Sequence, residues 1–179
     1  MFEKSTVMDA EGINRSIARI ATEILERNGG IDNLVIIGIR AGGVYLAHRL
    51  REAIKRMEGA EVPVGILDIT LYRDDIGLSG TGKPRLGTTR IPFSLDKMVV
   101  VLFDDVIFTG RTTRAAMDAL IDFGRPKRIE LAVLIDRGHR ELPICPNYVG
   151  KSLPSALWER VTVYLNEEDG KDEVVIEKA

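Results

Sequence analysis

One apolar run, residues 98–103, constrains this chain more than any other feature, because two carboxylates and a hydroxyl-rich turn follow it directly. The run Met-Val-Val-Val-Leu-Phe has the length and β-branching of a strand that is covered on both faces, as in a parallel sheet. Asp104 and Asp105 come next, at the carboxyl end of this strand, where open α/β sheets bind their ligands. A helix is expected over residues 114–123. The pattern predicts a ligand site between this strand and this helix.

The turn between them, residues 109–113, reads Thr-Gly-Arg-Thr-Thr. Free backbone N–H groups and the positive end of the helix dipole attract anions at such a turn. Its threonines add hydroxyl donors, and Gly110 allows close approach of the backbone. We therefore expect a phosphate in the turn and the vicinal hydroxyls of a ribose on Asp104 and Asp105. An ordinary capped helix explains one Asp or one Thr, but explains poorly two adjacent carboxylates with three threonines.

The stretch 99–113 resembles the phosphoribosyl pyrophosphate (PRPP) motif of type I phosphoribosyltransferases, in which two acidic residues precede a Thr-Gly-x-Thr turn. Two further stretches are similar to parts of the PyrR family, bifunctional regulators of pyrimidine-operon attenuation with uracil phosphoribosyltransferase activity. Residues 68–75 read Asp-Ile-Thr-Leu-Tyr-Arg-Asp-Asp, and residues 136–143 read Asp-Arg-Gly-His-Arg-Glu-Leu-Pro. The resemblance runs in the same order over nearly the whole chain, from about residue 9 to residue 164.

The resemblance implies that the two carboxylates and the whole turn bind PRPP and the product nucleotide. These residues are Asp104, Asp105, Val106, Ile107, Phe108, Thr109, Gly110, Arg111, Thr112 and Thr113. Displacement of pyrophosphate builds positive charge on the sugar ring, which the site must stabilise together with the leaving anion. The residues expected to act catalytically are Asp104, Asp105 and Arg40. Mg²⁺ is expected to enter with PRPP, because the sequence shows no dedicated cluster of metal ligands.

A second turn follows the apolar strand expected at Leu34–Ile39 and reads Arg40, Ala41, Gly42, Gly43. One guanidinium and closely approachable amides suit a diphosphate group. Taken alone, the segment is equally explained as a glycine-rich turn with a surface arginine. The resemblance implies that Arg40, Ala41 and Gly42 form the pyrophosphate loop, a loop that often carries a cis peptide bond not involving proline.

Residues 72–90 are rich in glycine, proline and polar groups and are too long for an ordinary connection. We expect this segment to be a lid that excludes water from the reacting sugar when it closes. The charged and aromatic residues at its start are Tyr72, Arg73, Asp74 and Asp75. A solvated charged loop would explain any one of these residues equally well.

Uracil as the acceptor rests on the family resemblance, which implies a small hood over about residues 136–160. Backbone groups in this segment could read the amide edges of uracil. The base-binding residues are expected to be Asp136, Arg137, Gly138 and His139.

RNA binding is likewise implied by the family, whose members regulate through a leader messenger RNA. The expected first helix carries Arg15, Arg19 and Arg27, and the hood adds His139 and Arg140. In a dimer these residues could form a basic surface for RNA. Helical arginines are also common on plain solvated faces, and three glutamates dilute this helix.

Strand and helix signals alternate along the chain, which predicts an α/β fold with a mostly parallel sheet flanked by helices. Asp9 is expected to cap a first helix that ends at Gly29. Further strands are expected over residues 34–39, 63–71, 129–135 and 161–165, and a second helix over about 43–57. With 179 residues, 45% of them hydrophobic, the chain is expected to form one domain. The resemblance implies the type I phosphoribosyltransferase fold.

The composition indicates which partners and which cellular compartment to expect. The formal net charge of −2 argues against indiscriminate attraction to nucleic acid. The single cysteine, Cys145, permits no intrachain disulfide, and no apolar run approaches the ~20 residues that span a bilayer. We expect a cytoplasmic protein without a membrane contact, and the family implies a homodimer or a higher homo-oligomer.

Three hypotheses for the function stay open at this point. The first is a uracil phosphoribosyltransferase that also binds pyr leader RNA in response to uridine nucleotides such as UMP and UTP. The second is a plain phosphoribosyltransferase for another base without RNA binding. The third is a nucleotide-sensing regulator with little turnover.

Overall fold

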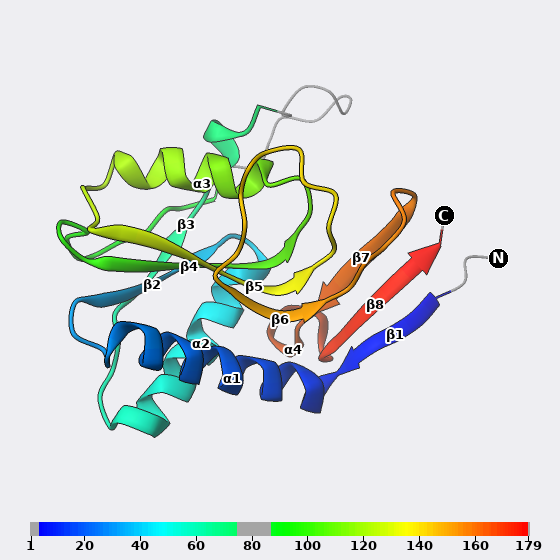
Figure 1. Ribbon diagram of the computed structural model, residues 1–179, viewed down its shortest axis with the longest axis horizontal. Helices are drawn as coiled ribbons and strands as arrows, with labels where there is room; N and C mark the ends of the chain where they lie inside the picture. Colours follow the sequence, from blue (N-terminus) through cyan, green and yellow to red (C-terminus); the bar gives the residue numbers. More distant parts are fainter. Residues whose placement is uncertain (1–3, 75–86, 179) are drawn as a thin grey trace.

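The computed structural model describes residues 4–74 and 87–178, which form two sheets and the helices packed on them (Figure 1). The central sheet has five parallel strands in the order β3-β2-β4-β5-β6. Its strands are β2 (Leu34–Ile39), β3 (Val64–Leu67), β4 (Val99–Ile107), β5 (Arg128–Asp136) and β6 (Tyr148–Ser152). The expectation of a mostly parallel α/β sheet is confirmed.

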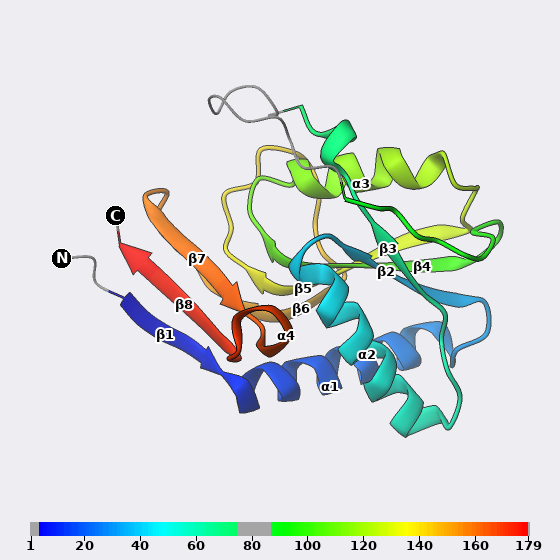
Figure 2. The same cartoon turned by 180° about the vertical axis from the view of Figure 1, so that it is seen from behind.

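Helices cover both faces of the central sheet, as Figure 2 shows from behind. Helices α1 (Ala10–Asn28) and α2 (Gly42–Glu58) pack on one face, and α3 (Arg111–Ile121) packs on the other. All six residues of β2 are buried, which explains why its sequence is a continuous apolar run rather than an alternating one.

The first helix forms as the sequence predicts. The side chain of Asp9 accepts a hydrogen bond from the Gly12 backbone N–H at 2.8 Å and caps the helix N-terminus. Gly29 ends the helix with a left-handed backbone, at φ 67°.

A second, smaller sheet joins the two ends of the described chain. It is antiparallel, in the order β1-β8-β7, and was not expected from the sequence. Its strands are β1 (Lys4–Asp9), β7 (Glu159–Tyr164) and β8 (Glu173–Lys178), with the short helix α4 (Asn166–Asp169) between the last two.

Several expected boundaries are corrected. Strand β4 continues to Ile107, so Asp104 and Asp105 lie within the strand and not beyond it. Helix α3 begins at Arg111 rather than at residue 114, directly after Gly110, whose left-handed backbone at φ 91° favours glycine. Strand β3 ends at Leu67, and a one-turn 3₁₀ helix, η1 (Thr70–Tyr72), follows it.

The segment expected as a hood, residues 136–160, is not one unit in the fold. Its middle forms β6, which pairs with β5 as the last strand of the central sheet. Residues 137–147 form a loop between β5 and β6 that we call the base loop. Asp75, expected at the start of the lid, lies outside the described residues.

Candidate active site

Two adjacent carboxyl groups occupy the carboxyl-terminal part of β4. Asp104 is only 7% exposed, and its Oδ1 accepts a hydrogen bond from the Asp105 backbone N–H at 2.9 Å. The Oδ1 of Asp105 accepts a bond from the Val106 N–H at 2.7 Å. Burial, and then the charge of Asp105, raise the pKa of Asp104 well above its ordinary value. Burial also raises the pKa of Asp105, against the hydrogen bonds that its carboxylate accepts.

Residues 40–43, which we call the Arg40 turn, pack directly on β4 at Asp104 and Asp105. The approach is this close because Gly42 and Gly43 have no side chains. A Cβ atom at Gly42 would lie 2.8 Å from Oδ2 of Asp105. A Cβ atom at Gly43 would collide with the carbonyl oxygen of Phe103 and lie 3.2 Å from the Asp104 Cα atom. The Arg40–Ala41 peptide bond is cis, the backbone feature that the resemblance implies for this loop. The two expected catalytic segments therefore meet.

Asp68 lies near Arg40 and was not singled out by the sequence reasoning. Its side chain accepts hydrogen bonds from the backbone and hydroxyl of Thr70 and from the Gly87 N–H. Burial opposes ionisation, but these bonds and the charge of Arg40 lower the pKa of Asp68. The available signal was its position directly after β3, at the same sheet edge as Asp104.

The turn between β4 and α3 lines a cavity of about 350 Å³. Its walls are residues 106–113 together with Asp104, Arg73 and Glu141. Arg73 Nη1 donates to the Thr112 hydroxyl at 3.4 Å. The cavity thus combines helix N-terminal amides, hydroxyls and guanidinium groups, which is the chemistry that binds a phosphate.

Arg111 links this turn to two other segments. Its Nη1 lies 2.8 Å from Oδ2 of Asp74, and its Nε lies 2.9 Å from Oε2 of Glu141. Glu141 is a second residue that the sequence reasoning did not single out, although it lies in a stretch that carried the resemblance. Asp74 of the expected lid and Glu141 of the base loop therefore both contact the turn at residues 109–113, which we call the phosphate turn.

Two of the residues expected to bind the base, Arg137 and His139, contact the Phe108 ring. The guanidinium carbon of Arg137 lies 4.1 Å from the centroid of this ring, and the His139 ring meets it edge-on with centroids 5.8 Å apart. Arg137 is 8% exposed and donates to the Ser155 hydroxyl at 3.0 Å and to the Ala156 carbonyl at 2.9 Å. Phe108, Arg137 and His139 together form an aromatic and cationic platform beside the phosphate turn.

Comparisons with known proteins agree with this geometry. The phosphoribosyl transferase domain family matches residues 4–167. A protein of Pelotomaculum thermopropionicum named "Bifunctional protein PyrR" is 59% identical over 97% of this chain and 96% of its own length. One of Chloroflexus aurantiacus with the same name is 56% identical over 98% and 96%. The chain belongs to the PyrR family.

Solved structures with low sequence identity share the fold. The hypoxanthine phosphoribosyltransferase of Trypanosoma cruzi, in complex with the product IMP, superposes with a TM-score of 0.72 at 19% identity, over 98% of this chain and 90% of the other. A hypoxanthine-guanine phosphoribosyltransferase of Bacillus anthracis gives 0.65 at 21% identity, over 84% of both chains. The type I phosphoribosyltransferase fold is therefore shown.

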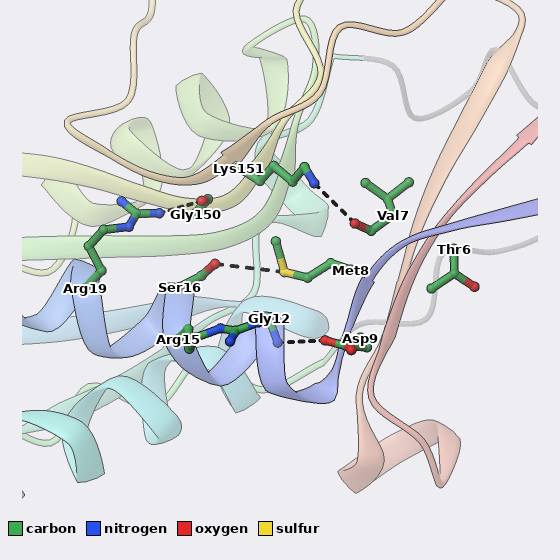
Figure 3. Close-up of a pocket in the computed structure, with 10 residues that line it drawn as sticks. All are labelled: Thr6, Val7, Met8, Asp9, Gly12, Arg15, Ser16, Arg19, Gly150 and Lys151. Carbon is green, nitrogen blue, oxygen red and sulfur yellow. Dashed lines mark hydrogen bonds between the residues drawn. The ribbon is translucent and has the colours of Figure 1, made fainter.

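The PyrR family resemblance implied that five residues form an RNA surface in a dimer, and within the single chain these five lie in separate places. Arg15 and Arg19 line a pocket of about 590 Å³ between β1, α1 and β6, together with Lys151 (Figure 3). Arg15 also pairs with Glu11 at 2.8 Å, and Arg19 Nη2 donates to the Gly150 carbonyl at 2.5 Å.

The other three expected RNA residues make contacts elsewhere. Arg27 lies near the end of α1, with its Nε 3.5 Å from the carboxylate of Glu130. His139 contacts the Ser155 carbonyl, and Arg140 is bonded within the base loop and to the Phe108 carbonyl.

Within residues 4–74 and 87–178, no group of three His, Cys, Asp or Glu side chains is placed to hold a metal ion. None of the helices in the described part of the chain is long and apolar enough to cross a bilayer.

Proposed function

We propose that this PyrR-family chain transfers the phosphoribosyl group of PRPP to uracil, giving UMP and pyrophosphate, and that it regulates pyrimidine genes by binding their leader RNA. The observation that carries the transferase half is the junction of three segments. Asp105 lies against Gly42 of the Arg40 turn, and its neighbour Asp104 lines the cavity formed by residues 106–113. A phosphoribosyl diphosphate needs these three contacts within the length of one molecule.

The proposed roles follow from the chemistry of each group. Asp104 and Asp105 hold the ribose hydroxyls and offer negative potential to the sugar ring as the bond from C1 to pyrophosphate breaks. The bond from C1 to N1 of uracil forms, and the proton released from N1 is taken up by the departing pyrophosphate. The turn at residues 109–113 anchors the 5′-phosphate, and Arg40 faces the departing pyrophosphate.

Mg²⁺ fits this site as a companion of PRPP. Asp104 and Asp105 offer adjacent hard oxygen ligands in a buried position, where burial raises the pKa of both carboxyl groups and a bound cation would favour their ionised forms. Asp104 and Asp105 are the residues that would hold the ion. When bound, Mg²⁺ would neutralise charge on the leaving pyrophosphate.

We propose that uracil lies beside Phe108, where the base loop offers Arg137 and His139. Tyr72, Arg73 and Asp74 belong to the proposed lid, supported by the Arg111–Asp74 ion pair and the Arg73–Thr112 hydrogen bond. We further propose one domain over residues 1–179, a cytoplasmic location and a homo-oligomer, as the family implies.

A PRPP-dependent assay with a panel of bases tests the transferase half. We expect conversion of uracil to UMP with release of pyrophosphate. Turnover of a purine alone would favour the plain phosphoribosyltransferase, and tight UMP binding without turnover would favour the nucleotide-sensing regulator.

The regulatory half is tested by a gel-shift with pyr leader RNA. We expect binding that UMP strengthens, and a lower affinity for Arg15→Gln, because Arg15 lies in the basic pocket of Figure 3. Absence of specific binding at low salt would contradict this half while leaving the transferase intact.

A further inference from the structure

Three successive carbonyl groups, at the last residue of β4 and the first two residues after it, accept hydrogen bonds from the base loop. The Ile107 carbonyl accepts from the Arg137 backbone N–H at 3.2 Å. The Thr109 carbonyl accepts from the N–H groups of Glu141 and Leu142, at 3.0 and 3.2 Å. The Phe108 carbonyl between them accepts from a side chain, Nη1 of Arg140, at 2.9 Å. The base loop therefore fixes the orientation of three consecutive peptide groups.

These bonds also orient amides that line the phosphate cavity. In a trans peptide the carbonyl and the N–H of the next residue point in opposite directions. A Phe108 carbonyl held toward the base loop therefore turns the Thr109 N–H away from that loop. Thr109 and Gly110 line the 350 Å³ cavity. Phosphate binding by backbone amides depends on this orientation, because a rotated peptide would present an oxygen to the anion.

Arg140 is itself held on several sides. Its Nη2 lies 2.6 Å from Oδ2 of Asp136, and its Nε donates to the Ile144 carbonyl at 3.0 Å. Nη1 also approaches the Gly138 carbonyl at 3.4 Å. The side chain is 22% exposed. A planar guanidinium satisfies acceptors in these different directions at once, whereas a lysine ammonium on a flexible stem does not reproduce that geometry.

We propose that Arg140 is a positioning residue of the transferase site. It holds the Phe108–Thr109 peptide so that the Thr109 amide is available to the 5′-phosphate of PRPP and UMP. This inference rests on the proposed function. It assigns Arg140 to the nucleotide site through its contacts, in place of the free surface cation that an RNA contact would need.

The test compares the binding of UMP with that of uridine, which lacks the phosphate, by isothermal titration. We expect Arg140→Ala to weaken UMP binding about tenfold or more, the size of one lost hydrogen bond to a charged group. Uridine binding is expected to change by less than about twofold. Added guanidinium ion is expected to restore part of the UMP affinity, which a merely structural loss would not allow.

Arg51→Met is the matched control, because Arg51 forms a surface ion pair with Glu52 on α2. This variant should keep the wild-type ratio of uridine to UMP dissociation constants. An unchanged ratio in Arg140→Ala, or an equal loss for both ligands, would overturn the inference. If Arg140→Ala does not fold, the same ratio is read in Arg140→Lys. A wild-type protein that binds UMP no tighter than uridine would instead overturn the proposed function.

Discussion

At the scale of single residues, the carboxyl group of Asp104 combines deep burial with a second carboxyl group beside it. Burial and the charge of Asp105 raise its pKa above the ordinary 3.8, against the weaker opposing effects of the hydrogen bond from the Asp105 backbone N–H and the charge of Arg73. Because the folded-state pKa lies above the unfolded one, the folded protein holds its proton more tightly. The stability that this provides is complete below about pH 4 and is lost as the pH rises through the raised pKa.

Asp104→Asn is therefore expected to raise the melting temperature at pH 8 and to leave it nearly unchanged at pH 4. The gain corresponds to roughly 1–3 kcal/mol, the cost of a poorly compensated buried group. The same variant should lower kcat by about 10²-fold or more, since it removes negative charge at the sugar ring. Thermal melts across pH, with activity assays, measure both effects. Asp32→Asn, an exposed control, should change neither.

At the scale of elements, the close approach of α2 to β4 depends on Gly43. A Cβ atom there would meet the Phe103 carbonyl and the Asp104 Cα, both of which are backbone and cannot move aside cheaply. Gly43→Ala is expected to displace the Arg40 turn from the carboxylates and to lower kcat/KM at least about tenfold. Assays of PRPP turnover measure the loss.

Gly170→Ala is the control for Gly43→Ala. It separates the loss of activity caused by the clash with β4 from a loss caused by backbone strain alone. Gly170 has a φ of 70°, but open space surrounds its Cβ position. That variant should lose about 1 kcal/mol of stability and keep wild-type activity. Equal activity in Gly43→Ala and Gly170→Ala would show that the contact with β4 does not hold the site together.

The elements that follow local rules were predictable, and those that depend on distant partners were not. The Asp9 cap, the Gly29 end and the buried strand at Leu34–Ile39 each follow from adjacent residues, and the structure confirms them. Strand β1 is largely exposed and pairs with β8 from the other end of the chain, so its short polar sequence carries no local signal. Strand β6 was also not predicted, because it depends on pairing with β5 and lies in a segment that contains several prolines.

At the scale of the whole molecule, the candidate site also has a part that local sequence predicts and a part that depends on residues far apart in the chain. Residues 104–113 were predictable as a group because one continuous stretch carries the carboxylates and the turn. The Arg140 contact with Phe108 spans 32 positions, and the Asp68 contact with Gly87 spans 19. Such contacts are set by the way the sheet brings loop ends together, which spacing along the chain does not encode.

Arg49 of α2 forms ion pairs with two carboxylates in the segment between β7 and β8, and so links the small sheet to the helices of the central sheet. Its Nη2 lies 2.5 Å from Glu167 and 2.7 Å from Asp172, and its side chain is 17% exposed. Arg49→Met should therefore speed amide hydrogen exchange in β1, β7 and β8 by roughly tenfold, with little change in β2 and β4. Hydrogen exchange read by mass spectrometry resolves these strands.

The loosened sheet is also expected to affect the base loop, because Ser155 and Ala156, just before β7, accept the bonds of Arg137. The KM for uracil in Arg49→Met should rise roughly threefold with kcat nearly unchanged. Arg51→Met, which removes a neighbouring surface cation, should change neither exchange nor KM. Faster exchange in the small sheet with an unchanged KM would mean that the sheet moves independently of the base loop, against the coupling through Arg137.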